Sequence, residues 1–83
     1  MDTLVNLRKQ IDNIDDKIIQ LLDERMKICQ QVGQVKKDNN IGLTHTSREN
    51  DIIDRLSTGV SLTRDDIKSI YEKIFIVSKS KQI

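Results

Sequence analysis

The stretch LVNLRKQIDNIDDKIIQLLDERMKICQQVGQV, residues 4–35, decides the fold. Ten positions in it recur at alternating spacings of three and four residues, and we call these positions the seam. The ten seam positions are Leu4, Leu7, Ile11, Ile14, Ile18, Leu21, Arg25, Ile28, Val32 and Val35. All are apolar except Arg25. This coiled-coil pattern predicts one continuous helix from Thr3 to Asp38, which the Asn-Asn-Ile-Gly sequence at residues 39–42 ends.

The length of this helix predicts a homodimer. At about 1.5 Å per residue it measures roughly 50 Å, whereas a compact chain of 83 residues has a diameter of about 30 Å. The rest of the chain is too short to cover the seam. A second copy is therefore expected along it, and the monomer is not expected to be a stable species.

Two further helices follow. The run Thr46-Ser47-Arg48-Glu49 has the form of a capping box and predicts a short helix that ends near Thr58-Gly59. The run Thr63-Arg64-Asp65-Asp66 opens a third helix, which continues to the end of the chain. The expectation is an all-α protein with one domain over residues 1–83, built from a long, a short and a medium helix.

Composition excludes several classes of partner. There are 14 Lys and Arg against 13 Asp and Glu, so the formal net charge of +1 gives no basic footprint for nucleic acid, and a DNA-binding three-helix module is disfavoured. Neither a signal peptide nor a membrane-spanning run is present, and Cys29 is the only cysteine. These features predict a cytoplasmic protein without a membrane partner.

Arg25 interrupts the apolar seam and has no carboxylate three or four residues away. Its guanidinium could reach solvent or pair with an acid on another helix. An anionic ligand is the alternative that explains a cation among apolar neighbours. Lys36 follows about three turns later on nearly the same face. Alone it is typical of a surface lysine near a helix end, but together the two side chains could converge on a small dianion.

Two more arginines are ambiguous. Arg8 has Asp12 four residues on, as in an ordinary surface pair. It also lies about 25 Å from Arg25 along the helix, so only a second, antiparallel copy could bring the two together. Arg48 opposes the dipole in the first turn of the second helix, and Asp51 offers it a local partner.

The third helix carries Tyr71, Phe75, Ser78 and Gln82 as a stripe that begins apolar and ends in neutral hydrogen-bonding groups. His45 is the only histidine and has no cluster of metal ligands around it in the sequence. No serine is placed beside a histidine as a nucleophile with its base. We therefore expect no metal, no cofactor and no covalent intermediate.

The chain resembles the all-helical chorismate mutases in four ordered runs at matching separations. These are LRKQIDNID at 7–15, LLDER at 21–25, VGQVK at 32–36 and RENDIIDRL at 48–56. The resemblance implies rearrangement of chorismate to prephenate in the biosynthesis of phenylalanine and tyrosine. It also implies three helices per subunit and two subunits intertwined through their first helices around two equivalent sites.

The resemblance implies a role for each matching residue. Arg25, Arg48 and Arg8 of the partner subunit would hold the two carboxylates of chorismate. Lys36 and Gln82 would donate hydrogen bonds to the ether oxygen of the breaking bond, which makes these two, with Arg25, the catalytic residues.

The remaining matching positions would complete substrate binding. Glu49 would accept a hydrogen bond from the ring hydroxyl, and Ser78 would assist at a carboxylate. His45 occupies the loop position where much of the family has an aspartate, and a backbone contact there would be unaffected by that change.

Two alternative functions remain open. The same fold and a similar cationic pocket support isochorismate-pyruvate lyase activity, and the residues named above do not distinguish the two reactions. The other alternative is a non-catalytic helical dimerisation module, in which Arg25 and Lys36 would simply be solvated.

Overall fold

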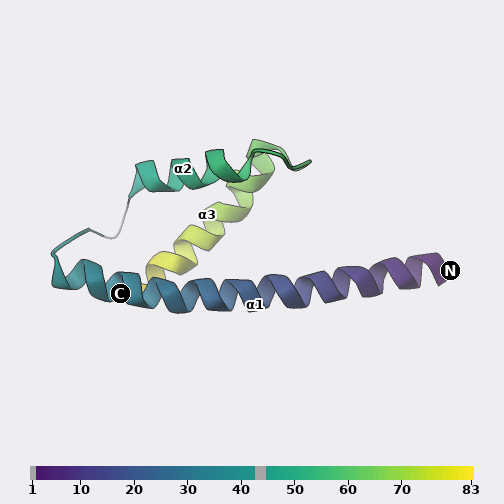
Figure 1. The fold of residues 1–83 in the computed structure, drawn as a ribbon, viewed down its shortest axis with the longest axis horizontal. Coiled ribbons are helices and arrows are strands. Elements are labelled where there is room, and N and C mark those ends of the chain that lie inside the picture. Colours follow the sequence, from purple (N-terminus) through teal and green to yellow (C-terminus); the bar gives the residue numbers. More distant parts are fainter. Residues whose placement is uncertain (1, 43–44) are drawn as a thin grey trace.

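The computed structural model describes residues 2–42 and 45–83, which form three helices: α1 (Asp2–Asp38), α2 (Thr46–Leu56) and α3 (Arg64–Lys81). Figure 1 shows α1 as a straight rod, with α2 and α3 folded as a hairpin over its C-terminal half. The described part contains no strand, which confirms the all-α prediction. The molecule extends over 56 × 23 × 17 Å, so its shape is that of a rod with a hairpin attached.

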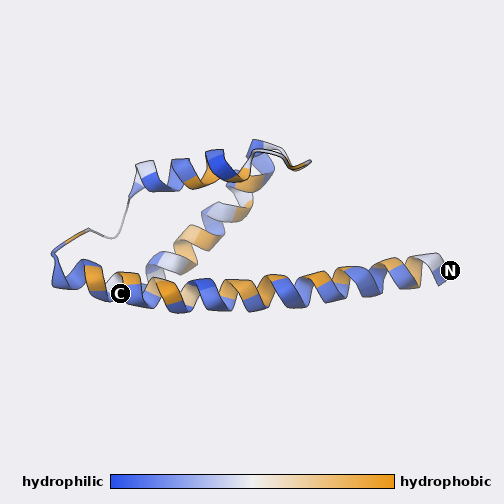
Figure 2. Cartoon of the chain, in the orientation of Figure 1, coloured by the Kyte–Doolittle hydropathy of each residue, from blue (hydrophilic) through white to orange (hydrophobic). Residues whose placement is uncertain are grey.

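The observed α1 agrees closely with the predicted helix, since it begins one residue earlier and ends at the predicted Asp38. Asn40, just beyond its end, has a φ of 55°, a left-handed conformation that terminates helices and that asparagine tolerates. In Figure 2, where the ribbon is coloured by hydropathy, hydrophobic residues recur along one edge of α1. The nine apolar seam residues are all exposed, with relative accessibilities of 39–62%. In a single copy the seam is therefore left largely uncovered.

The start of α2 differs from the prediction. The N-cap is His45 rather than a residue of the expected capping box, and no side chain caps this helix. Thr46 is the first residue of the helix itself, so its hydroxyl does not accept the N-cap hydrogen bond from a backbone N–H of the first turn. Glu49 is consequently released from the reciprocal bond of a capping box, and its carboxylate pairs with Lys79 on α3 instead. The helix was predicted to end near Thr58-Gly59, but α2 ends earlier, at Leu56, and Gly59 follows with a positive φ of 74°.

The start of α3 follows the prediction. Thr63 is its N-cap and accepts a hydrogen bond from the Asp66 backbone N–H, while the Asp66 carboxylate accepts one from the Thr63 N–H. Arg64 then donates to Asp54 of α2 at 2.8 Å. These contacts fix the closed end of the hairpin, where Ile53 and Ile67 are buried.

The C-terminal end of α3 docks on α1 at Gly33. A Cβ atom added to this glycine would lie 2.5 Å from the Gln82 Cα and closer still to its carbonyl oxygen. No real Cβ approaches backbone atoms so closely, so only glycine permits the two helices to meet here. The contact buries both Gly33 and Gln82.

None of the helices in residues 2–42 and 45–83 combines the length and apolar character that crossing a bilayer requires.

Replacing Gly33 with alanine should lower stability, although alanine is favoured over glycine by about 1 kcal/mol inside helices. The displaced neighbour is backbone rather than a flexible side chain, and such overpacking costs about 1–3 kcal/mol. We expect the melting temperature of Gly33→Ala, followed by circular dichroism, to fall by about 5 °C or more. Gly42→Ala is the matched control, since nothing lies within 4 Å of its added Cβ. Equal melting temperatures in the two variants would contradict this account.

Candidate functional site

A pocket of about 880 Å³ lies between the C-terminal part of α1, α2 and the last turns of α3. Its volume is within the range of small-molecule sites. Seven of the eight residues that the sequence singled out line it: Arg25, Lys36, His45, Arg48, Glu49, Ser78 and Gln82. Apolar side chains such as Val35, Ile52 and Phe75 complete its walls.

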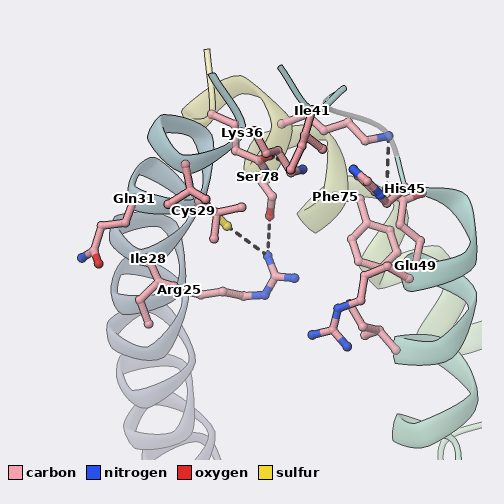
Figure 3. Close-up of a pocket in the computed structure, with 16 residues that line it drawn as sticks. Arg25, Ile28, Cys29, Gln31, Lys36, Ile41, His45, Glu49, Phe75 and Ser78 are labelled. Atoms are coloured by element: carbon pink, nitrogen blue, oxygen red, sulfur yellow. Dashed lines mark hydrogen bonds and ion pairs between the residues drawn. The ribbon is translucent and has the colours of Figure 1, made fainter. Parts of the chain in front are cut away.

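Arg25 is held in the pocket by neutral groups. Its Nη1 donates to the Ser78 hydroxyl and lies 3.8 Å from the Cys29 sulfur. Ser78 is free to accept because its own proton goes to the Ile74 carbonyl at 2.7 Å. Figure 3 shows the guanidinium directed from α1 into the space in front of α2. Among the described residues no carboxylate forms an ion pair with Arg25, so its positive charge is available to a ligand.

Lys36 and Gln82 meet at another wall of the pocket. The lysine Nζ donates to Gln82 Oε1 at 2.7 Å. Gln82 is 9% exposed, and its backbone rests on Gly33. The bond turns the amide oxygen toward the lysine, which leaves the amide nitrogen directed to the other side. Two hydrogen-bond donors from different helices are thereby brought together.

The α2 wall contributes charged groups of both signs. Arg48 is exposed on the first turn of the helix, and Glu49 forms an ion pair with Lys79 at 3.1 Å. His45 lies at the start of α2, with its Nε2 2.9 Å from the Gly42 carbonyl oxygen. Figure 3 shows His45 and Glu49 on the side of the pocket opposite Arg25.

Arg8 is the predicted residue that the chain does not bring to this pocket. It lies on the exposed N-terminal half of α1 and is not among the lining residues. The distance along the rod to Arg25 is about 25 Å, as expected for 17 residues of helix. Within one copy, the pocket is formed without it.

Lys79 lines the pocket but was missed by the sequence interpretation. A signal was present, because it follows Phe75 by four residues and precedes Gln82 by three, which places all three on one helical face. A lysine in the last turn of a helix is ordinarily explained by the dipole. Because the dipole already accounts for a lysine at this position, the sequence alone gives no reason to assign Lys79 to a site.

The lining side chains thus carry four cations, namely Arg25, Lys36, Arg48 and Lys79, and a single carboxylate. In the described part of the chain no group of three His, Cys, Asp or Glu side chains is arranged to hold a metal ion. An excess of positive charge beside neutral hydrogen-bond donors suits a small organic polyanion, which can be bound and polarised through several fixed donors.

Comparison with known proteins identifies the family. Residues 7–83 match the family described as chorismate mutase type II. The chain is 38% identical to the bifunctional chorismate mutase/prephenate dehydratase of Aquifex aeolicus over 56 residues, which are 68% of this chain and 16% of that protein. It is 36% identical to the chorismate mutase of Methanocaldococcus jannaschii over 56 residues, 68% of this chain and 57% of the relative.

A solved structure agrees over the full length. A conserved hypothetical protein from Pyrococcus furiosus superimposes with a TM-score of 0.85 at 37% identity, covering 100% of this chain and 99% of that one. The chain spans only about one sixth and just over half of the two curated relatives. The match nevertheless includes nearly every residue described above, from the seam to the last turn of α3, and the chain belongs to the chorismate mutase type II family.

Proposed function

We propose that this chain catalyses the rearrangement of chorismate to prephenate, a step in the biosynthesis of phenylalanine and tyrosine. The observation that carries the proposal is the meeting of Arg25 with the Lys36–Gln82 pair in one pocket. Chorismate carries two carboxylates and an ether oxygen, which match cations and neutral donors respectively. Membership of the family supports the same assignment.

The reaction requires neither a base nor a nucleophile from the protein. Within one molecule an ether C–O bond breaks while a C–C bond forms, so no proton, electron or group is exchanged with the enzyme. The protein must hold the folded conformer and stabilise the negative charge that grows on the ether oxygen. Positioning lowers the barrier by removing conformational freedom beforehand. Fixed donors lower it further, at about 3–4 kcal/mol for a single well-placed donor.

The proposed roles follow the placement of the side chains. Arg25 and Arg48 bind the carboxylates from opposite walls, and Ser78 assists at the carboxylate near Arg25. Lys36 and Gln82 donate to the ether oxygen, the lysine through its ammonium group and the glutamine through its amide nitrogen. Glu49 accepts from the ring hydroxyl, and the backbone at His45 contributes at the pocket rim.

Product identification tests the function directly. We expect purified protein to convert chorismate to prephenate, detected by loss of chorismate absorbance and by the proton NMR spectrum of the product, which separates these two isomers. Release of pyruvate from isochorismate without any prephenate would favour the lyase alternative. Absence of both reactions would favour a dimerisation module.

Lys36→Ala should lose most turnover because it removes a donor to the ether oxygen. The expected fall in kcat is about 100-fold or more, while circular dichroism stays helical. Lys37→Ala is the matched control, since this neighbouring lysine is exposed and lies outside the pocket lining. Full turnover in Lys36→Ala would count against the proposed site.

We also propose that the active form is an intertwined homodimer of this single domain. The nine apolar seam residues are exposed in one copy, and burying them against a second seam would be favourable at about 25 cal/mol per Å². An antiparallel partner would place its N-terminal half along the C-terminal half of α1. The partner's Arg8 would then complete the carboxylate binding begun by Arg25.

Mixing two inactive variants tests this arrangement. Arg8→Ala and Arg25→Ala each damage every site of their own homodimers, but a mixed dimer carries one undamaged site and one doubly damaged site. Random mixing after co-refolding should therefore restore about one quarter of wild-type activity. Sedimentation should show a species of twice the chain mass of 9.6 kDa. Mixed dimers that form, as seen by native mass spectrometry, yet stay inactive would exclude sharing of Arg8 between subunits.

A further inference from the structure

Glu49 is the one carboxylate among the lining residues of a pocket suited to dianions. Left alone, its negative charge would repel the two carboxylates of a ligand bound nearby. The same carboxylate is proposed to accept a hydrogen bond from the ring hydroxyl. It is therefore needed for binding although its negative charge opposes the binding of a dianion. Something in the pocket must offset that charge.

Lys79 is placed to do so. Its Nζ lies 3.1 Å from Glu49 Oε2, and the two side chains are 33% and 25% exposed. The other ion pairs in the described residues are more exposed, Lys27–Asp23 at 70% and 65% and Arg64–Asp54 at 50% and 63%. Solvent therefore screens the Glu49–Lys79 pair less than it screens the others.

The pair also fixes the direction of the carboxylate. Lys79 engages Oε2, and a carboxylate retains lone pairs on its second oxygen for another donor. Because Lys79 projects from α3 and Glu49 from α2, the bond bridges two walls of the pocket. It keeps the Glu49 side chain at the wall of the pocket, where otherwise the side chain could rotate on the surface of α2.

We propose that Lys79 is a positioning residue, which neutralises Glu49 and holds one of its oxygens so that the other faces the ring hydroxyl of chorismate. Lys79 acts through Glu49 and has no direct role at the reacting bond. This inference rests on the proposed function. It adds a residue from α3 whose effect should depend entirely on the charge of a residue on α2.

A double-mutant cycle isolates this dependence. In Lys79→Met the uncompensated Glu49 carboxylate should raise KM for chorismate about tenfold, with a smaller change in kcat. In a Glu49→Gln background no charge remains to be neutralised, and adding Lys79→Met should change KM less than about twofold. Lys79→Arg should restore most of the wild-type KM because a guanidinium also pairs with a carboxylate.

Arg64→Met is the matched control. It removes the second ion pair that the described residues form between α2 and α3, at Asp54, which lies outside the pocket lining. A near-normal KM in this variant, with helicity unchanged in all variants by circular dichroism, separates charge compensation from stapling of the hairpin. Lys79→Gln provides a second test of the same charge loss if Lys79→Met loses helicity.

The outcomes are distinct. A tenfold rise in KM both in the wild-type background and in the Glu49→Gln background would overturn the inference, because Lys79 would then act directly on the substrate or on the fold. Equal effects of Lys79→Met and Arg64→Met would overturn it as well. Failure of the wild-type protein to convert chorismate would instead overturn the proposed function, and the role of Lys79 with it.

Discussion

The close approach of Gln82 to Gly33 is the contact on which the pocket depends. With no side chain at Gly33, the backbone of α3 reaches that of α1, and the last turns of α3 are held across the C-terminal half of the rod. Ser78 thereby faces Arg25, and Gln82 faces Lys36. A wider separation of the two helices would leave each of these cations without its neutral neighbour. The glycine therefore sets the spacing at which chemistry on α1 and α3 can be shared.

The two halves of α1 have different environments in one copy of the chain. The C-terminal half carries Arg25 and Lys36 and forms one wall of the pocket, whereas residues 2–21 are exposed throughout. In the proposed dimer the exposed half is the part that serves the neighbouring site through Arg8. Folding, association and completion of the site would then be a single event, because the surface that stabilises the dimer is the surface that delivers the last arginine.

The sequence was sufficient to predict three helices and to single out Arg25, because a strict repeat of apolar residues and an interrupting cation are local signals. The roles expected of Arg48, Glu49 and Ser78 came instead from the resemblance to a known family. The sequence predicted that a helix begins at Thr63, where the structure has a capping box, but it placed a capping box wrongly at Thr46, where His45 is the N-cap. The same motif occurs in both runs, and only tertiary contact decides that Glu49 bonds to Lys79 rather than to the helix start. The Gly33 contact was equally invisible, since it depends on how α3 crosses α1 and not on any spacing within either helix.

The position of α2 has a mechanical consequence. In the described residues α2 packs on α3 and makes no comparable contact with α1. The wall of the pocket that α2 forms is therefore supported by α3 and not by α1. Among the described residues, the packing contacts between the walls that carry Arg25 and Arg48 run through α3. A ligand bound by both arginines would connect α1 and α2 directly, in addition to the packing of each helix on α3. Occupancy would thus stiffen the arrangement of α1 and α2 around the pocket.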